Sequence, residues 1–448
     1  MLKLLTRIFL ATFICLAVSN VSSGQMTSNQ NGKVDRTFGA YGFAHMMPYQ
    51  YGAAAVSESG IAFAASPMNS IPNTLAVSKQ LPNGSFDTTF DQDGFSITTF
   101  PRYVEPKTIV IQADGRILIG GYINPSTGNG WDFFLVRYLS NGQLDTFFGS
   151  GGFVALNIIP DTNDPNDISY DTIGSIILNS DGTILVSGTS DQRLTSQNKT
   201  CVKAVLAKFR DNGSLEPSFG NGGISLITLH FNEGYTFGSS PLRLKSIRNG
   251  KFIGGLRLMK GQFGEPNHSE PAILVRYLED SSIDTSFGVE GIVDLTAGST
   301  SSLNWHLYDF TELLDQKLLV LTGGAINRLN ADGSFDGTFG NNGRLNVANN
   351  NMSTFTVLGD GSIITSGSFF RNTPFGYRAA GELRKYFSDG SLDVRFGISG
   401  RVLIDSPGYD TFLGNSCQLS DSTITVIGHR TINNGQIFRS KVSIKRKL

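Results

Sequence analysis

One short phrase recurs seven times along the chain, and it limits the possible folds more than any other feature. Each copy combines a turn dipeptide, an acidic residue and a phenylalanine three residues after the acid, as in NGQLDTFFG at 141–149. The copies lie at 31–39, 83–91, 141–149, 212–220, 280–288, 332–340 and 389–397. Their phenylalanines are 52 to 71 residues apart. Such a period indicates a repeat architecture whose variation in length lies in loops.

The residues of the repeated phrase are predicted to be structural. Asn-Gly or Asp-Gly opens every copy except the one at Asp280-Ser281, and these dipeptides supply the positive φ that tight turns need. Six of the acids follow a basic residue by eight positions: Lys79, Arg137, Lys208, Arg276, Arg328 and Lys385. We expect one ion pair or hydrogen-bonded clamp per unit, with the phenylalanine filling the gap between units. A ring of charged ligand-binding pairs is the alternative. The acids and phenylalanines are Asp35, Asp87, Asp145, Glu216, Asp284, Asp336 and Asp393, with Phe38, Phe90, Phe148, Phe219, Phe287, Phe339 and Phe396.

Short apolar strands fill the intervals between the copies. In 152–212, for example, strands are predicted at 153–157, 172–179, 183–189 and 202–210. Four strands per unit and seven units predict an all-β fold: a single seven-bladed β-propeller of four-stranded antiparallel blades. The ring is expected to close near the two termini, where 43–46 would pair beside 442–445 and leave no exposed edge. Alternatively, the short strand after each Phe-Gly opens its own blade.

The repeat resembles a known family. The stretches LVRYLSNGQLDTFFG, LAKFRDNGSLEPSFG and LVRYLEDSSIDTSFG are similar to the delta-60 repeat, which is found in bacterial exported proteins and is understood as a β-propeller blade. The resemblance covers roughly residues 31–448. It implies a propeller fold and export, and it implies no agreed activity, cofactor or catalytic residue. Asp91 departs from the usual Phe-Gly, and Ser281 departs from the usual turn glycine.

Residues 1–24 are predicted to be a secretory signal peptide, and residues 25–448 a single propeller domain. Lys3 and Arg7 flank the start of a short apolar run at 8–18, and small residues follow at 22–24. The run is short for a transmembrane helix. The alternatives to a cleaved signal peptide are an uncleaved membrane anchor and lipid attachment at Cys15. We therefore expect an exported protein in the periplasm, at the cell surface or in the medium. Cys201 and Cys417 are expected to be separate half-buried or buried residues.

Composition and the absence of known motifs argue against several classes of function. Lys and Arg number 36 and Asp and Glu number 37, so the chain lacks the basic excess of a nucleic-acid-binding protein. It contains no HExxH, GxSxG or phosphate-binding glycine loop. No catalytic residue and no cofactor are therefore predicted. The sequence favours a monomeric, non-enzymatic scaffold without a membrane span after signal cleavage, which binds a protein or surface glycan through its loops. The alternative is a polysaccharide hydrolase or lyase in the propeller mouth, using acids such as Asp294, Glu312 or Asp405.

Two long segments break the repeat and are candidate sites. The first contains Asp161, Asp164, Asp167 and Asp171, whose carboxylates could gather around Ca²⁺, the only cofactor the sequence suggests. A solvated acidic loop is the alternative. The second is the most aromatic segment of the chain, with Phe369, Phe370, Arg371, Phe375 and Tyr377. It could form a binding patch for a partner or a sugar ring, or it could pack on its own aromatic side chains.

Overall fold

A computed structural model describes most of the chain. The described residues are 33–34, 43–45, 52–57, 60–65, 73–125, 130–158, 168–194, 199–227, 235–237, 242–260, 271–296, 306–347, 352–373, 376–404, 409–420, 423–432 and 440–447. They form strands and turns only, as the sequence predicted. No helix among them is long and apolar enough to cross a membrane.

Thirty strands follow one another in the described residues. The first fourteen are β1 (Lys33–Val34), β2 (Phe43–His45), β3 (Gly52–Ser57), β4 (Gly60–Ala65), β5 (Thr74–Gln80), β6 (Phe95–Thr99), β7 (Val104–Ile111), β8 (Ile117–Ile123), β9 (Gly130–Tyr138), β10 (Phe153–Leu156), β11 (Ile168–Leu178), β12 (Ile184–Leu194), β13 (Lys199–Phe209) and β14 (Ile224–Ile227). The remainder are β15 (Tyr235–Phe237), β16 (Arg243–Ser246), β17 (Phe252–Lys260), β18 (Ala272–Tyr277), β19 (Ile292–Asp294), β20 (Leu307–Glu312), β21 (Leu318–Thr322), β22 (Ala325–Leu329), β23 (Arg344–Asn346), β24 (Met352–Val357), β25 (Ile363–Thr373), β26 (Gly376–Tyr386), β27 (Arg401–Ile404), β28 (Tyr409–Ser420), β29 (Thr423–Ile432) and β30 (Ser440–Lys447).

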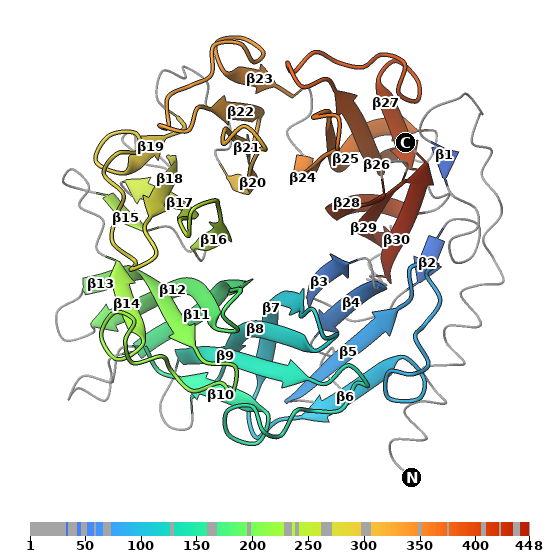
Figure 1. Ribbon diagram of the computed structural model, residues 1–448. Helices are drawn as coiled ribbons and strands as arrows, with labels where there is room; N and C mark the ends of the chain where they lie inside the picture. Colours follow the sequence, from blue (N-terminus) through green and yellow to red (C-terminus); the bar gives the residue numbers. More distant parts are fainter. Residues whose placement is uncertain are drawn as a thin grey trace.

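The strands are arranged as a β-propeller. Consecutive strands pair into antiparallel sheets, such as β20–β23 and β24–β27, and these sheets stand around a central axis as blades (Figure 1). Hydrogen bonding in the described residues gives three sheets of four strands, two of five and one of eight. The eight-stranded sheet arises because β9 and β11 pair in parallel at Ser169–Gly130 and Tyr170–Trp131. Hydrogen bonding alone therefore does not separate the seven four-stranded blades that the sequence predicted.

Strands from the two ends of the described chain pair with each other. β2 lies antiparallel to β30, with Phe43 opposite Ile444 and His45 opposite Val442. β1 also pairs with β30, through Lys33 and Lys447. The predicted pairing of 43–46 with 442–445 is thus present over 43–45 and 442–444, and Met46 lies outside the described residues. Cys201 lies in β13 and Cys417 in β28, which belong to different sheets.

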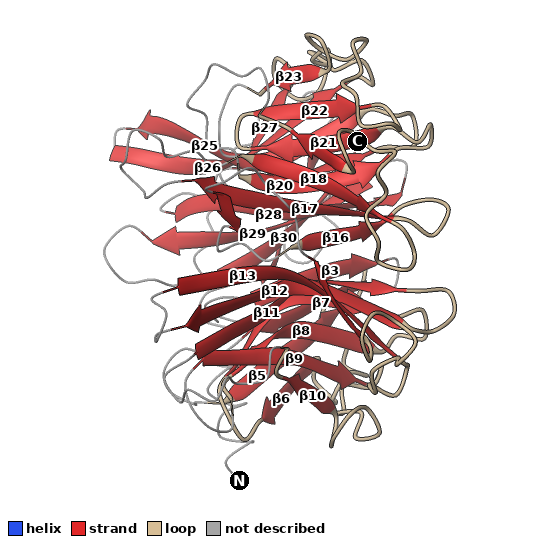
Figure 2. Cartoon of the chain, turned by 90° about the vertical axis from the view of Figure 1, so that its left-hand side faces the viewer, coloured by secondary structure: helices blue, strands red, loops and turns tan. Residues whose placement is uncertain are grey.

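The sheets present two different ends to solvent. Because consecutive strands run antiparallel, the first-to-second and third-to-fourth connections of a blade emerge at one end. We call this end the turn face; it carries the described copies of the repeated phrase, and Figure 2 shows most of the described loops on one side of the ring. The second-to-third connections and the links between blades emerge at the opposite end, which we call the connection face.

The core lies between neighbouring blades. Every residue of β8 is buried, including Ile117, Ile119 and Ile123, because blades cover this strand on both sides. The strand therefore has a continuous apolar sequence and not an alternating one. Gly120 permits close contact with the next blade, since a Cβ there would lie 2.9 Å from the Ile173 Cγ2 atom of β11.

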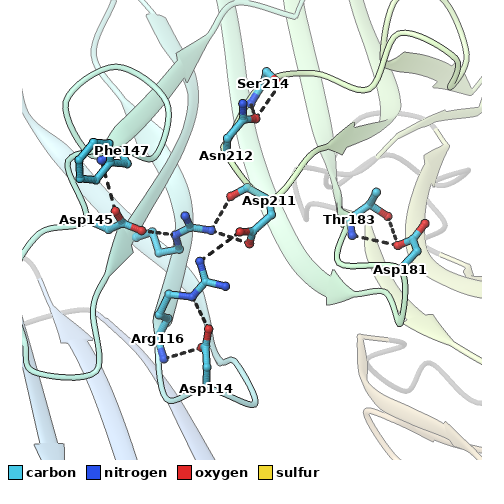
Figure 3. A network of polar contacts seen from close by, with 10 residues as sticks. Asp114, Arg116, Asp145, Phe147, Asp181, Thr183, Asp211, Asn212 and Ser214 are labelled. Atoms are coloured by element: carbon cyan, nitrogen blue, oxygen red, sulfur yellow. Dashed lines mark hydrogen bonds and ion pairs between the residues drawn. The ribbon is translucent and has the colours of Figure 1, made fainter.

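The repeated phrase joins neighbouring blades at the turn face. Arg137 Nε donates to the Asp145 carboxylate at 2.7 Å, and its guanidinium lies 4.5 Å from the centre of the Phe148 ring. The Nη1 group reaches the next blade and donates to the backbone oxygen of Asp211 and, at 2.8 Å, to its carboxylate (Figure 3). Arg276 and Arg328 likewise pair with the acid of their own copy and lie over its phenylalanine, but across the junction they donate only to backbone oxygens, those of Ala331 and Ser388.

The predicted clamp is present in four of the six pairs that the sequence suggested. Lys79 pairs with Asp87 at 3.1 Å, in addition to the three arginine pairs. Glu216 pairs instead with Arg210, and Asp393 with Arg395. The phenylalanines of the described copies are buried, and Phe219 is the most accessible of them at 6%. Asp35 and Phe38 lie outside the described residues.

Candidate ligand-binding site

The predicted calcium site is only partly within the described structure. Asp161, Asp164 and Asp167 lie outside the described residues. Asp171 lies in β11, and its side chain is fully buried. The described residues contain no group of three or more acidic, histidine or cysteine side chains that could hold a metal ion.

The buried Asp171 carboxylate makes hydrogen bonds within the protein near the connection face. Its carboxylate accepts a hydrogen bond from the Ile158 amide at 2.8 Å and another from the Ser169 hydroxyl at 2.7 Å. Burial raises the pKa of Asp171 to about 6, although these bonds and one from Ser190 act in the opposite direction. The carboxylate therefore ties the link that follows β10 to the start of β11.

This raised pKa predicts a pH dependence of stability. The folded-state pKa exceeds the unfolded value, so the native state binds this proton more tightly and is stabilised by Asp171 as the pH falls from about 6 toward about 4. We expect the wild-type unfolding midpoint, measured calorimetrically, to rise between pH 7 and pH 5. The Asp171→Asn variant lacks this titration and should lose that rise. An identical rise in both proteins would show that other groups cause it.

The predicted aromatic patch is divided between two sides of a strand. Phe369, Phe370 and Arg371 are consecutive half-buried residues of β25, and successive side chains of a strand point to opposite sides. Phe369 lies against Arg401, whose guanidinium is 4.9 Å from the ring centre. Phe375 lies outside the described residues, and for Tyr377 only the backbone, in β26, is described. Phe369 and Phe370 therefore do not share one surface.

The acids suggested for a glycosidase lie at opposite ends of the molecule. Asp294 ends β19 at the connection face, where its carboxylate accepts a hydrogen bond from the Thr296 amide at 2.7 Å. Glu312 ends β20 at the turn face and accepts from the Arg248 amide at 2.9 Å. Asp405 lies outside the described residues. Asp294 and Glu312 cannot act together on one bond.

A cluster that the sequence analysis did not identify lies at the connection face. Its centre is Glu105, near the start of the innermost strand β7, with a side chain 14% exposed. Three groups donate to its carboxylate: the Tyr122 hydroxyl at 2.5 Å, the Tyr103 hydroxyl at 3.1 Å and the Lys107 ammonium at 2.5 Å. Burial raises the pKa of Glu105, but these hydrogen bonds outweigh it and hold the pKa below its usual value.

Aromatic rings extend this cluster across two blades. Trp131 of β9 stacks on Tyr122 of β8, with ring centres 4.2 Å apart and planes 17° from parallel. Tyr170 of β11 meets Trp131 edge-on at 4.9 Å. Trp131 and Tyr170 are half-buried, and Lys107 is 38% exposed. We call Tyr103, Glu105, Lys107, Tyr122, Trp131 and Tyr170 the aromatic–carboxylate cluster. It combines aromatic faces, hydroxyls and an ionised carboxylate, which is a set that can hold a sugar ring or a protein side chain.

Sequence reasoning missed this cluster because its members come from four strands and from the residue before β7. Trp131 follows Asn129-Gly130 in the stretch NGWDFFLVRY, which has the turn dipeptide but not the acid and phenylalanine at the spacing of the repeated phrase. A signal was available: Trp131 is one of only two tryptophans in the chain, and it stands at the polar start of an apolar strand.

Comparison with known proteins supports the fold. A family model described as "Domain of unknown function (DUF5122) beta-propeller" matches residues 112–148, which include β8, β9 and all but the last residue of one copy of the repeated phrase. The match describes a β-propeller and not a delta-60 repeat, so that finer assignment stays a prediction. No curated protein matches the sequence.

Solved structures give only distant likenesses. A protein of unknown function from Dyadobacter fermentans is 12% identical with a TM-score of 0.41, covering 94% of this chain and 99% of that one. The GH93 alpha-L-arabinofuranosidase of Fusarium graminearum is 9% identical with a TM-score of 0.45, covering 92% and 98%. Drosophila Semaphorin 2a is 9% identical with a TM-score of 0.45, covering 94% and 77%. The chain is thus a β-propeller by its sheets and by its family match.

Proposed function

We propose that this protein is an exported, non-enzymatic β-propeller of the delta-60 kind, which binds a protein or surface glycan through its connection face. In this proposal β7–β10 and β11–β14 count as two blades of the eight-stranded sheet. The other sheets then bring the total to seven, and the pairing of β1 and β2 with β30 closes the ring.

The aromatic–carboxylate cluster is the observation that carries the binding proposal. Trp131 and Tyr122 form a stacked pair near solvent, and Glu105 is held ionised beside them. Aromatic side chains of this kind dominate the binding energy of many interfaces. The same face receives the second-to-third connections and the inter-blade links, which vary in length between units. Variable loops on a rigid scaffold are the usual place for binding residues.

Replacement of Trp131 by alanine is expected to weaken partner binding. The loss should be about 2 kcal/mol, which is the usual cost of truncating a central aromatic residue, and corresponds to roughly a 30-fold weaker affinity. The measurement is binding of the purified protein to an array of defined oligosaccharides, followed by titration calorimetry with the strongest one.

Phe147→Ala is the matched control for this experiment. Phe147 is 89% exposed and lies at the turn face, so its removal should leave binding unchanged. Thermal unfolding of both variants checks that each is folded. Binding that survives Trp131→Ala, or that disappears with Phe147→Ala, would contradict the proposed face. If no oligosaccharide binds, the glycan part of the proposal is wrong, and the same variants are then tested against candidate protein partners by cross-linking.

A polysaccharide hydrolase or lyase is the second candidate, and it has less support. Glu105 is occupied by three donors and its pKa is lowered, which does not suit a general acid. Asp171 has a pKa near 6 but is fully enclosed. Release of reducing sugar from any array glycan by the purified protein would favour this candidate over the scaffold.

A further inference from the structure

Two consecutive junctions between blades differ in their charged residues at the turn face. At the junction between β7–β10 and β11–β14, the Asp211 carboxylate is contacted by two guanidinium groups, from Arg137 at 2.8 Å and Arg116 at 3.2 Å (Figure 3). The next junction lies between β11–β14 and the strands β15–β19. There Lys208 stands at the place of Arg137, Thr183 at the place of Arg116, and Glu279 at the place of Asp211. This junction thus has an acid, Glu279, at the place of Asp211, but it has no arginine at the places of Arg137 and Arg116.

The turn of this junction lacks one backbone hydrogen bond that other junctions make, and the Ser281 hydroxyl instead donates to the Ser225 hydroxyl across the junction at 2.9 Å. Gly213 and Gly333 occupy the equivalent position at other junctions, where a Cβ would lie 2.8 Å from the Gly149 nitrogen and 2.9 Å from the Gly288 nitrogen. These two amides donate across the junction to Asn212 and Asp332, at 2.8 and 2.7 Å. Ser281 takes the glycine position here, with φ 71°, and no such bond joins Gly220 to Asp280, although both residues are described.

A cavity of about 390 Å³ fills the space at this junction. Asp181, Lys208 and Glu279 contribute its charged groups, and Phe219 and Phe252 are among its apolar residues. The Lys208 ammonium lies 3.8 Å from the Asp181 carboxylate, and the acid of its own repeat, Glu216, accepts from Arg210 at 3.0 Å. The charged groups of the cavity sum to −1, from two carboxylates and one ammonium.

We propose that this cavity binds a guanidinium group supplied by a ligand. At three other junctions of the same chain, an arginine guanidinium lies over the repeat phenylalanine at 4.5 to 4.7 Å and donates to the residue that precedes the next turn. The cavity is lined by Phe219, the repeat phenylalanine, and by Glu279, which stands where Asp211 accepts from Arg137 through its backbone oxygen and its carboxylate, but no arginine lies between them. A planar guanidinium matches a carboxylate through two parallel hydrogen bonds and stacks on an aromatic face. The ligand is either an arginine side chain of another protein or a small guanidinium compound.

The test is calorimetric titration of the purified protein with N-acetyl-L-arginine amide. The matched probes are N-acetyl-L-lysine amide, which carries a point charge, and N-acetyl-L-citrulline amide, which is uncharged and of nearly the same shape. We expect the arginine compound to bind about tenfold or more tightly than either of them, because only it makes the charged fork. A tripeptide with a central arginine and free L-arginine distinguish the two sources: tighter binding of the tripeptide indicates a protein ligand, and tighter binding of free arginine a small compound.

Two variants connect the binding to this cavity. Thr183→Arg/Lys208→Arg restores the side chains of the neighbouring junction, so it should fill the cavity, abolish binding and keep or raise the unfolding midpoint. Glu279→Gln alters an exposed side chain, so folding should be preserved, and it should weaken binding about tenfold by removing the charge. Absence of binding to the wild-type protein would overturn the proposal. So would equal binding by the wild-type protein and Glu279→Gln.

Discussion

Replacement of Phe148 by alanine is expected to lower the free energy of unfolding by about 3–5 kcal/mol. The Phe148 side chain is fully buried, and its ring lies beneath the Arg137 guanidinium at the junction with the next blade. Alanine would leave a cavity at this junction, and it would also remove the surface on which the guanidinium rests. The measurement is the free energy of unfolding from urea denaturation, with the slope checked for two-state behaviour.

The preceding residue provides the control. Phe147 belongs to the same turn but is 89% exposed, so Phe147→Ala should change the free energy of unfolding by less than about 0.5 kcal/mol. Two neighbouring substitutions of the same type would then differ several-fold in effect. Similar effects of the two substitutions would mean that the phenylalanine of the repeated phrase does not join the blades.

The repeat made the fold class and the local role of its residues predictable. Asn-Gly and Asp-Gly favour turns through positive φ, and the apolar runs between them are of the length of short strands, as in β8. The contact across the junction was not predictable, because Arg137 and Asp211 are 74 residues apart and belong to different copies. A pattern within one copy contains no information about which residue of the next copy lies opposite.

The candidate site was harder to predict for a related reason. Glu105, Tyr122 and Trp131 lie on three strands, and they meet only because β7, β8 and β9 pair side by side. The sequence instead drew attention to 369–377, where aromatic residues are close in sequence. There the alternation of side chains along β25 places Phe369 and Phe370 on opposite sides. Aromatic residues that are close together in the sequence of a strand therefore do not form one surface patch, because neighbouring side chains point to opposite sides.

Replacement of Arg137 by alanine should be about as costly as the loss of Phe148. The side chains of Arg137 and Asp145 are 4% and 7% exposed, so removal of the guanidinium leaves a buried carboxylate without its cation. Breaking such a pair usually costs about 3–5 kcal/mol. The hydrogen bonds to Asp211 across the junction are lost at the same time. Urea denaturation provides the measurement, and Arg210→Ala is the control, because the Arg210 side chain is 53% exposed and its pair with Glu216 should contribute far less.

The Arg137→Lys variant distinguishes the ion pair with Asp145 within the blade from the hydrogen bonds to Asp211 across the junction. Lys79 shows that a lysine at this position can pair with the acid of its own repeat, at 3.1 Å from Asp87. A lysine lacks the planar fork that donates to both Asp145 and the next blade, so Arg137→Lys should fall between the wild-type protein and Arg137→Ala in stability. If the lysine variant is as stable as the wild-type protein, the contact across the junction contributes nothing, and the ion pair within the blade accounts for the whole effect. If it is as unstable as the alanine variant, the contact across the junction accounts for the whole effect, and the ion pair within the blade contributes nothing.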